Sequence, residues 1–208
     1  MTGIVDRIGR VDAVAIFDLD DTLIDTRGVL LPAALERVSR AIGVPKDRLN
    51  ARGKRIGEVL AGLEGLEPEA LRAAAEAWYS PEVPPLEPLP GAREALEALQ
   101  GRLRLFLLTR GDPERQQRKV DAVGLRSCFE GVVVRPIEGS GSKRDDIQRL
   151  LDRCGLPAER CAVIGDDDTD ELRHARDLGC LAIRVPETPI GAVAESLEAA
   201  GLISRQGS

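Results

Sequence analysis

The sequence predicts an α/β fold: a five-stranded parallel sheet with helices on both faces, plus a small all-helical insertion. Two observations lead to this prediction. Five short apolar runs of strand length occur along the chain, and four of them alternate with amphipathic helical patterns in its second half. The first run, at residues 13–17, is followed by a long stretch of helical patterns that ends in a proline-rich segment. The sequence therefore places a helical insertion between the first and second strands.

Composition limits the function classes. The chain has 208 residues, 43% hydrophobic and 31% charged, which is typical of a soluble globular protein with one core and room for a small insertion. A net charge of −6 and an aromatic content of 2% disfavour a protein that coats or stacks on nucleic acid. No apolar stretch has membrane-spanning length, and residues 1–12 lack the pattern of a signal peptide. We expect a cytoplasmic protein, a monomer or homodimer, that acts on a small molecule and binds neither nucleic acid polymers nor membranes.

Cysteine and histidine are too sparse for several kinds of site. The four cysteines lie far apart without a CxxC pair, so they are expected to be small buried or half-buried residues rather than zinc ligands. The one histidine, His174, excludes any mechanism that needs two. Its polar helical context predicts a surface position.

The first strand is predicted at Ala13–Phe17, because five apolar residues without alternation are typical of a strand buried on both faces. Helical patterns follow. Pro32 suits the first turn of a helix that Gly43 ends, and two more patterns cover 56–63 and 68–78. Five prolines between 81 and 90 exclude a helix or central strand there and mark the return to the core.

The insertion is therefore predicted to span 25–86, and the core to comprise 1–24 and 87–208. Trp78 and Tyr79 have two interpretations, lining the entrance to the site or filling the insertion's own hydrophobic core, and the core is favoured. A basic cluster in it has two interpretations that the sequence leaves open, a solvated helix face or a contact for a second anionic group of a ligand; it consists of Arg52, Lys54 and Arg55.

The rest of the chain alternates regularly between helix and strand. The strands are predicted at 103–108, 132–134, 161–164 and 181–185. The helices are predicted at 93–99, 113–123, 143–154, 169–178 and 190–200. Strands joined by helical crossovers run parallel and are covered on both faces, which completes the five-stranded sheet.

Chemically reactive side chains follow the strands. Asp18 and Asp20 follow the first strand, Thr109 and Arg110 end the second, and Asp166 follows the fourth. Because ligands bind at the carboxyl edge of such sheets, we expect these groups to gather at one site. Carboxylates crowded together repel unless a cation or proton relieves them, and Mg²⁺ is the natural cation. The alternative for the first acidic cluster is a solvated turn, in which Asp is common.

Four motifs in order resemble the haloacid dehalogenase superfamily of phosphohydrolases. They are Asp18-Leu19-Asp20-Asp21-Thr22, Leu107-Leu108-Thr109-Arg110-Gly111, Lys143, and Gly165-Asp166-Asp167-Asp168-Thr169-Asp170. The resemblance covers about residues 13–186 and implies a Rossmann-like core with a helical cap inserted after the first motif.

The resemblance implies a role for each residue. Asp18 is the expected nucleophile, which forms an aspartyl-phosphate, and Asp20 is the expected general acid and base. Thr109, Arg110 and Lys143 are expected to bind the phosphoryl group, and Lys143 also balances the charge of Asp18.

The expected metal is Mg²⁺, held by Asp18, Asp166 and the backbone carbonyl of Asp20.

Other acids near these motifs receive weaker assignments. Either Asp167 or Asp170 is expected to reach the metal through water or to orient its ligands. Asp168 and Glu171 are expected only to favour the start of a helix through its dipole. Asp21 stands where the family often has glycine, and because Asp tolerates left-handed backbone, we expect a structural role in the turn.

The function predicted is a Mg²⁺-dependent phosphatase that hydrolyses a small phosphate monoester, such as a sugar phosphate, phosphoglycolate or a nucleoside monophosphate. The presence of Asp20 argues against the dehalogenase branch, because a halide leaving group needs no proton. Two alternatives stay open: a phosphotransferase or phosphomutase with the same aspartyl-phosphate, and a catalytically silent binding protein.

Overall fold

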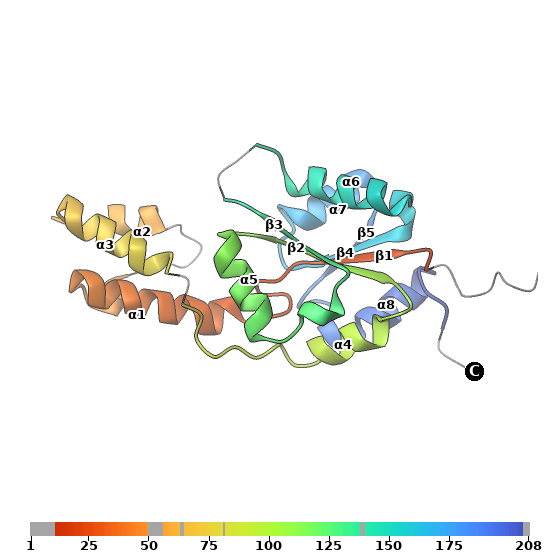
Figure 1. The fold of residues 1–208 in the computed structure, drawn as a ribbon, viewed down its shortest axis with the longest axis horizontal. Helices are drawn as coiled ribbons and strands as arrows, with labels where there is room; N and C mark the ends of the chain where they lie inside the picture. Colours follow the sequence, from red (N-terminus) through yellow and green to blue (C-terminus); the bar gives the residue numbers. More distant parts are fainter. Residues whose placement is uncertain (1–10, 50–55, 63–64, 81, 138–139, 206–208) are drawn as a thin grey trace, which may run out of the picture.

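The computed structural model describes residues 11–49, 56–62, 65–80, 82–137 and 140–205. Its five strands form one parallel sheet in the order β3-β2-β1-β4-β5, so the first strand lies in the centre (Figure 1). The strands are β1 (Val14–Phe17), β2 (Arg104–Arg110), β3 (Gly131–Arg135), β4 (Cys161–Gly165) and β5 (Leu181–Arg184). The predicted α/β fold is confirmed.

Eight α-helices lie in the described part of the chain. They are α1 (Leu31–Ile42), α2 (Ile56–Ala61), α3 (Pro68–Trp78), α4 (Ala92–Leu99), α5 (Pro113–Ala122), α6 (Lys143–Cys154), α7 (Glu171–Leu178) and α8 (Val193–Ala199). A π turn at Thr26–Leu30 leads directly into α1. Short 3-10 turns lie at Lys46–Arg48, Arg126–Cys128, Ala158–Arg160 and Ile190–Ala192. Arg52, Lys54 and Arg55 lie outside the described residues.

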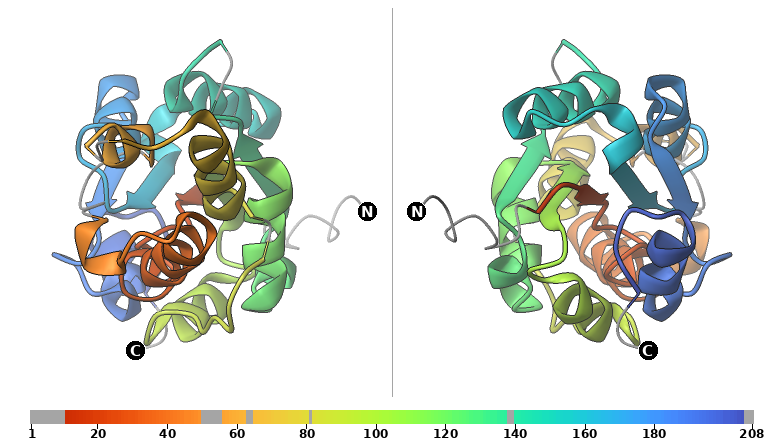
Figure 2. Two further views of the ribbon diagram at one scale, coloured as in Figure 1. Left: turned by 90° about the vertical axis from the view of Figure 1, so that its left-hand side faces the viewer. Right: turned by 90° about the vertical axis from the view of Figure 1, so that its right-hand side faces the viewer.

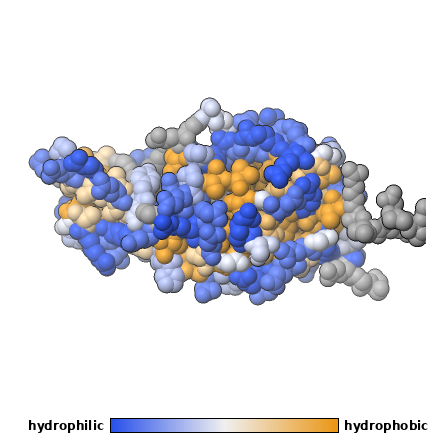
Figure 3. Space-filling view, in the orientation of Figure 1, coloured by the Kyte–Doolittle hydropathy of each residue, from blue (hydrophilic) through white to orange (hydrophobic). Residues whose placement is uncertain are grey.

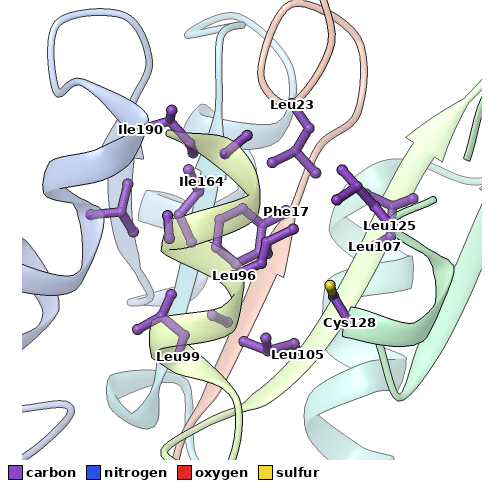
Figure 4. Packing of buried hydrophobic residues seen from close by; sticks show 14 of the residues in the cluster. Phe17, Leu23, Leu96, Leu99, Leu105, Leu107, Leu125, Cys128, Ile164 and Ile190 are labelled. Atoms are coloured by element: carbon purple, nitrogen blue, oxygen red, sulfur yellow. The ribbon is translucent and has the colours of Figure 1, made fainter. Parts of the chain in front are cut away.

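The sheet separates two hydrophobic layers. Alternate residues of β1 point to opposite faces, as the pleat requires. Val14 and Ile16 pack in a cluster with residues of α6 and α7, whereas Ala15 and Phe17 pack with residues of α4, α5 and α8 (Figure 4). All four side chains are at most 1% exposed. The unbroken apolar run therefore reflects burial on both faces.

The edge strand β3 is less covered than the central strands. All five residues of β3, the edge strand beside β2, are half-buried. In the space-filling view, hydrophobic surface lies across the middle of the core between bands of hydrophilic side chains (Figure 3). Arg104 and Glu130, near this edge, form a bidentate ion pair that flanks it with charge.

The helices α1, α2 and α3 have a hydrophobic cluster of their own. Its buried members are Val38, Leu49, Val59, Leu60 and Ala74. Trp78 packs against the cluster as predicted, but Tyr79 is 46% exposed, so the prediction of a core position for Tyr79 is wrong. The reason is that α3 ends at Trp78, and Tyr79 leaves the helical face that the cluster covers. The left view of Figure 2 shows these helices in front of one end of the core.

The chain leaves and re-enters the core at adjacent points. The backbone amide of Leu89 donates to the carbonyl oxygen of Leu23 over 2.8 Å, and Ile24 forms an antiparallel bridge with Pro88. The two connections between the sheet and the helical segment therefore run side by side. The division into domains at these points stays a prediction.

The prediction for the cysteines is confirmed, whereas the prediction for His174 is not. All four cysteines are free, and each is buried or half-buried, which confirms that prediction. The surface position predicted for His174 is wrong: its side chain is 15% exposed, with Nε2 3.6 Å from Oδ1 of Asp170, because α7 packs against α6. In the described part of the chain, no helix has the length and apolar character needed to cross a membrane.

The core can be tested at Leu96, which is fully buried on α4. We expect Leu96→Ala to lower the free energy of unfolding by about 2–5 kcal/mol, because the truncation leaves a cavity under the sheet. Urea unfolding measures the loss. The exposed neighbour Glu97 is the control, and Glu97→Ala should stay within about 0.5 kcal/mol of wild type. Equal losses in the two variants would contradict this description of the core.

Candidate active site

The ends of β1, β2 and β4 meet around one cavity of about 200 Å³. Its lining includes every residue that the sequence predicted for the site: Asp18, Asp20, Thr109, Arg110, Lys143 and Asp166. The lining also contains Asp21, Arg27, Asp167, Asp170 and Glu171. Residues from four distant parts of the sequence are thus brought together, because parallel strands direct their carboxyl ends to one edge.

Lys143 and Asp18 form the buried centre of this site. Asp18 follows β1, and its backbone amide donates to the carbonyl oxygen of Ile164 on β4, which fixes its position. The ammonium of Lys143, the first residue of α6, donates to Asp18 Oδ1 over 2.9 Å and to Glu171 Oε2 over 2.7 Å. Asp18 and Lys143 are 6% and 5% exposed. One cation therefore neutralises part of the charge of two buried carboxylates.

Burial is the largest single influence on the pKa values of Asp18 and Lys143. It raises the pKa of Asp18 to about 7, with Lys143 opposing the shift and Glu171 and Asp20 adding to it. Burial alone would lower the pKa of Lys143, but the charges of Asp18 and Glu171 outweigh it and raise that pKa. Lys143 therefore stays charged, while the negative charge around Asp18 is only partly compensated.

Asp20 lies in a different environment. Lys119 Nζ contacts both of its carboxylate oxygens, at 2.7 and 3.0 Å, and Gln116 Nε2 donates to Oδ2 over 2.8 Å. The hydroxyl of Thr26 also donates to Asp20. Burial would raise the pKa of Asp20, but the charge of Lys119 and these hydrogen bonds lower it. Two carboxylates separated by one residue thus have pKa values shifted in opposite directions.

Thr109 and Arg110 end β2 beside the start of α5. Thr109 is 1% exposed, and its hydroxyl accepts a hydrogen bond from Gln116. Asp112 caps α5 by accepting from the amide of Arg115 over 2.9 Å, so the helix does not depend on Thr109 for its cap. Arg110 is exposed and donates to the carbonyl oxygen of Ile137 over 3.2 Å.

An acidic cluster lies on the other side of Asp18. Carboxylate oxygens of Asp18, Asp166 and Glu171 lie within 4.8 Å of one another. Burial raises the pKa of Asp166, and Glu171 and Asp21 add to the shift. Its Oδ2 accepts from Arg27 Nη2 over 2.9 Å. Oxygen ligands with uncompensated charge fit a hard divalent cation.

Glu171 is the main correction to the sequence-based assignments. It was expected only to favour the start of α7, yet it is 2% exposed, bonds to Lys143 and accepts from the amide of Asp167 over 3.0 Å. Gly165 makes room for it, because a Cβ there would lie 2.4 Å from Glu171 Oε1. Asp168, in contrast, forms exposed ion pairs with Arg176 and Arg184.

The structure also gives the surroundings of Asp167 and Asp170, the two acids for which the sequence left a choice of role. Asp167 accepts hydrogen bonds from the amide and hydroxyl of Thr169, which closes the turn before α7. Asp170 Oδ2 lies 3.9 Å from Lys143 Nζ. Asp21 has a φ of +57°, the left-handed conformation that was predicted for it.

Sequence reasoning missed Gln116, Lys119 and Arg27. A signal existed for the first two: α5 is nearly free of apolar residues, although it packs beside the sheet, and its buried positions are Gln116, Lys119 and Val120. A helix with polar residues on its buried face lines a polar site. Arg27 gave no such signal, because it reaches Asp21 and Asp166 only through the turn before α1.

Comparison with known proteins agrees with this geometry. A family model described as a haloacid dehalogenase-like hydrolase matches residues 13–179. The chain belongs to this family. Its matched region includes all four motifs and the helical segment between the first two.

Two proteins similar to this chain carry phosphatase names. A glyceraldehyde 3-phosphate phosphatase of Methanocaldococcus jannaschii is 24% identical over 189 residues, covering 82% of this chain and 83% of that protein. A phosphoserine phosphatase of Thermus thermophilus is 34% identical over 132 residues, covering 60% of this chain and 53% of that protein. Among solved structures, a HAD-superfamily hydrolase of Geobacter sulfurreducens has a TM-score of 0.72 at 20% identity, covering 91% of this chain and 98% of that one, which shows the fold.

The raised pKa of Asp18 predicts a pH-dependent stability of the metal-free protein. The unfolded carboxyl titrates near 3.8 and the folded one near 7, so the folded state binds more protons between these values. The free energy of unfolding therefore falls as pH rises through this window. In EDTA, Asp18→Asn should gain stability relative to wild type from pH 5 to pH 8 by on the order of 2 kcal/mol.

Urea unfolding at the two pH values measures this gain. Asp177→Asn, at an exposed position of α7, is the matched control and should show no such trend. A stability difference between Asp18→Asn and wild type that stays the same at both pH values would contradict the assignment.

Proposed function

We propose that this chain is a Mg²⁺-dependent phosphatase that hydrolyses a phosphate monoester of a small metabolite through an aspartyl-phosphate on Asp18. The observation that carries the proposal is the pair of carboxylates in one cavity, Asp18 bound to Lys143 and Asp20 bound to Lys119. Such a separation of environments is how two neighbouring acids take different roles. The phosphatase names of two relatives support the same class of reaction.

In the first step, a carboxylate oxygen of Asp18 attacks the phosphorus atom. The bond between phosphorus and the ester oxygen breaks, and its electron pair goes to that oxygen. Asp20 in its protonated form gives its proton to the leaving oxygen, which departs as an alcohol. Lys143 holds Asp18 in place and offsets charge on the transferred group.

In the second step, water attacks the phosphorus of the aspartyl-phosphate. Asp20, now ionised, takes a proton from the water, and the bond between phosphorus and Asp18 breaks to release phosphate. Lys119 and Gln116 suit this step, because their contacts with Asp20 favour its ionised form. The proton on Asp20 then serves the next substrate.

The residues present fit the proposed metal. Asp18, Asp166 and the backbone carbonyl of Asp20 would hold Mg²⁺, and Glu171 supplies a further carboxylate next to them. When bound, the ion neutralises charge on the phosphoryl oxygens and on Asp18, so that two anions can approach each other. Thr109, Arg110 and Lys143 are proposed to bind the phosphoryl oxygens, and all three line the cavity.

The helical segment is proposed to be a cap domain over residues 25–86, with 1–24 and 87–208 as the catalytic core. Its separate hydrophobic cluster and the paired connections at Leu23 and Leu89 support this division. Arg27 and Thr26, at the start of the segment, contact acids of the site. A movement of the segment would therefore change the surroundings of Asp20 and Asp166 and exclude water from the reaction.

Phosphate release from a panel of small phosphate esters tests the proposal. We expect release with Mg²⁺ and none in EDTA. Asp18→Asn should lower the rate by at least about 1,000-fold, because the nucleophile is lost. Asp177→Asn, which changes an exposed acid on α7, should keep the wild-type rate.

Two results would contradict hydrolysis as the reaction. Recovery of rearranged sugar phosphates without free phosphate would indicate a phosphomutase that uses the same Asp18. Unchanged esters across the whole panel would favour a binding role for the fold.

A further inference from the structure

Two arginines from distant helices meet at the end of α3. Arg37, on α1, donates through Nε to the carbonyl oxygen of Ala77 over 3.1 Å. Arg115, on α5, donates through Nη1 to the carbonyl oxygen of Trp78 over 3.0 Å. Both carbonyls lie at the end of α3 and have no partner within that helix. Arg115 therefore joins the helical segment to the core, whereas the bond of Arg37 links two helices within the segment.

Their positive charge exceeds what this contact neutralises. Nη2 of Arg37 and Nε of Arg115 are buried and have no hydrogen-bond partner. In the described part of the chain, neither guanidinium forms an ion pair with a carboxylate. Burial lowers the pKa of Arg115, and the charge of Arg37 lowers it further. Two like charges with unused donors thus lie close enough to interact at the end of α3.

Anchoring α3 does not account for this arrangement. The negative end of a helix dipole corresponds to about half an elementary charge, whereas the two guanidiniums carry two. The carboxylates that act on Arg115 are already engaged: Asp20 is bound by Lys119, and Asp112 caps α5. A buried donor without a partner is costly, so the pair is suited to an anion that comes from outside the chain.

Arg115 lies within electrostatic reach of Asp20, which lines the cavity, although neither arginine is itself among the lining residues. Arg115 directly precedes Gln116, whose side chain bonds to both Asp20 and Thr109. In the proposed reaction Asp20 protonates the leaving oxygen, so the organic part of the substrate extends from Asp20. Arg37, on α1, is in turn close enough to Arg115 for its charge to act on it.

We propose that Arg37 and Arg115 together bind a carboxylate on the leaving group, so that the substrates are small phosphorylated carboxylic acids. A planar guanidinium presents paired N–H donors that match the two oxygens of a carboxylate. This inference rests on the proposed phosphatase function and names its substrate class. It distinguishes such acids from phosphorylated aldehydes and alcohols of the same size, which carry no charge apart from the phosphate.

Matched three-carbon esters test the inference. We expect wild type to have a kcat/KM for 3-phosphoglycerate about 10-fold or more above that for glycerol 3-phosphate and for glyceraldehyde 3-phosphate. Arg37→Met and Arg115→Met should each lower kcat/KM for 3-phosphoglycerate by about 10- to 100-fold, chiefly through KM. Glycerol 3-phosphate should change less than about threefold. Arg72→Met, which removes an exposed arginine from α3, is the control and should leave the preference unchanged.

A structural role alone would give a different result. If the arginines only anchor α3, the two variants lose stability and lose activity on all three esters equally, which would overturn the inference. A wild-type enzyme that prefers glyceraldehyde 3-phosphate would overturn it as well.

Binding separates this inference from the reaction itself. Calorimetric titration of Asp18→Asn, with Mg²⁺ present, measures the affinity for 3-phosphoglycerate and glycerol 3-phosphate without turnover. Tighter binding of the carboxylate compound, lost when Arg37→Met is added, would support the inference even if no ester were hydrolysed. Equal affinity for the two compounds would refute it whether or not the chain is a phosphatase.

Discussion

The rest of the site depends on one buried ammonium group. Lys143 lies between Asp18 and Glu171, and burying either carboxylate without it would leave an unpaired charge in the core. The fold supplies this contact at the meeting of three elements: Asp18 after β1, Lys143 at the start of α6, and Glu171 at the start of α7. The packing of α6 against α7 therefore determines where charge is placed at the end of the central strand.

Asp18 and Asp20, the two central acids, lie in different environments. Asp18 is buried against another carboxylate and keeps excess negative charge, which suits a group that must approach a cation and a phosphate. Asp20 has its own lysine from the opposite face of the sheet, which lowers its pKa and suits the ionised form that acts as a base. Lys119 and Lys143 come from different helices, so each environment can change without the other.

Local sequence patterns predicted the sheet and the positions of the four motifs, because strand burial and strand-end acids are visible along a short stretch. They predicted neither Glu171 as part of the buried centre nor Lys119 as the partner of Asp20, since both contacts join residues far apart in sequence. The predictions of a core position for Tyr79 and a surface position for His174 were wrong for a related reason. Exposure depends on where a helix ends and what packs beside it, and composition carries little of that information.

The paired connections have a consequence for how such a protein diversifies. Because the chain leaves at Leu23 and returns at Leu89, with a hydrogen bond between them, the helical segment begins and ends at nearly one point. A segment with adjacent ends can be lengthened, shortened or exchanged without altering the strand order or the position of Asp18. The sheet can therefore keep its chemistry while an interchangeable module alters the ligands it admits.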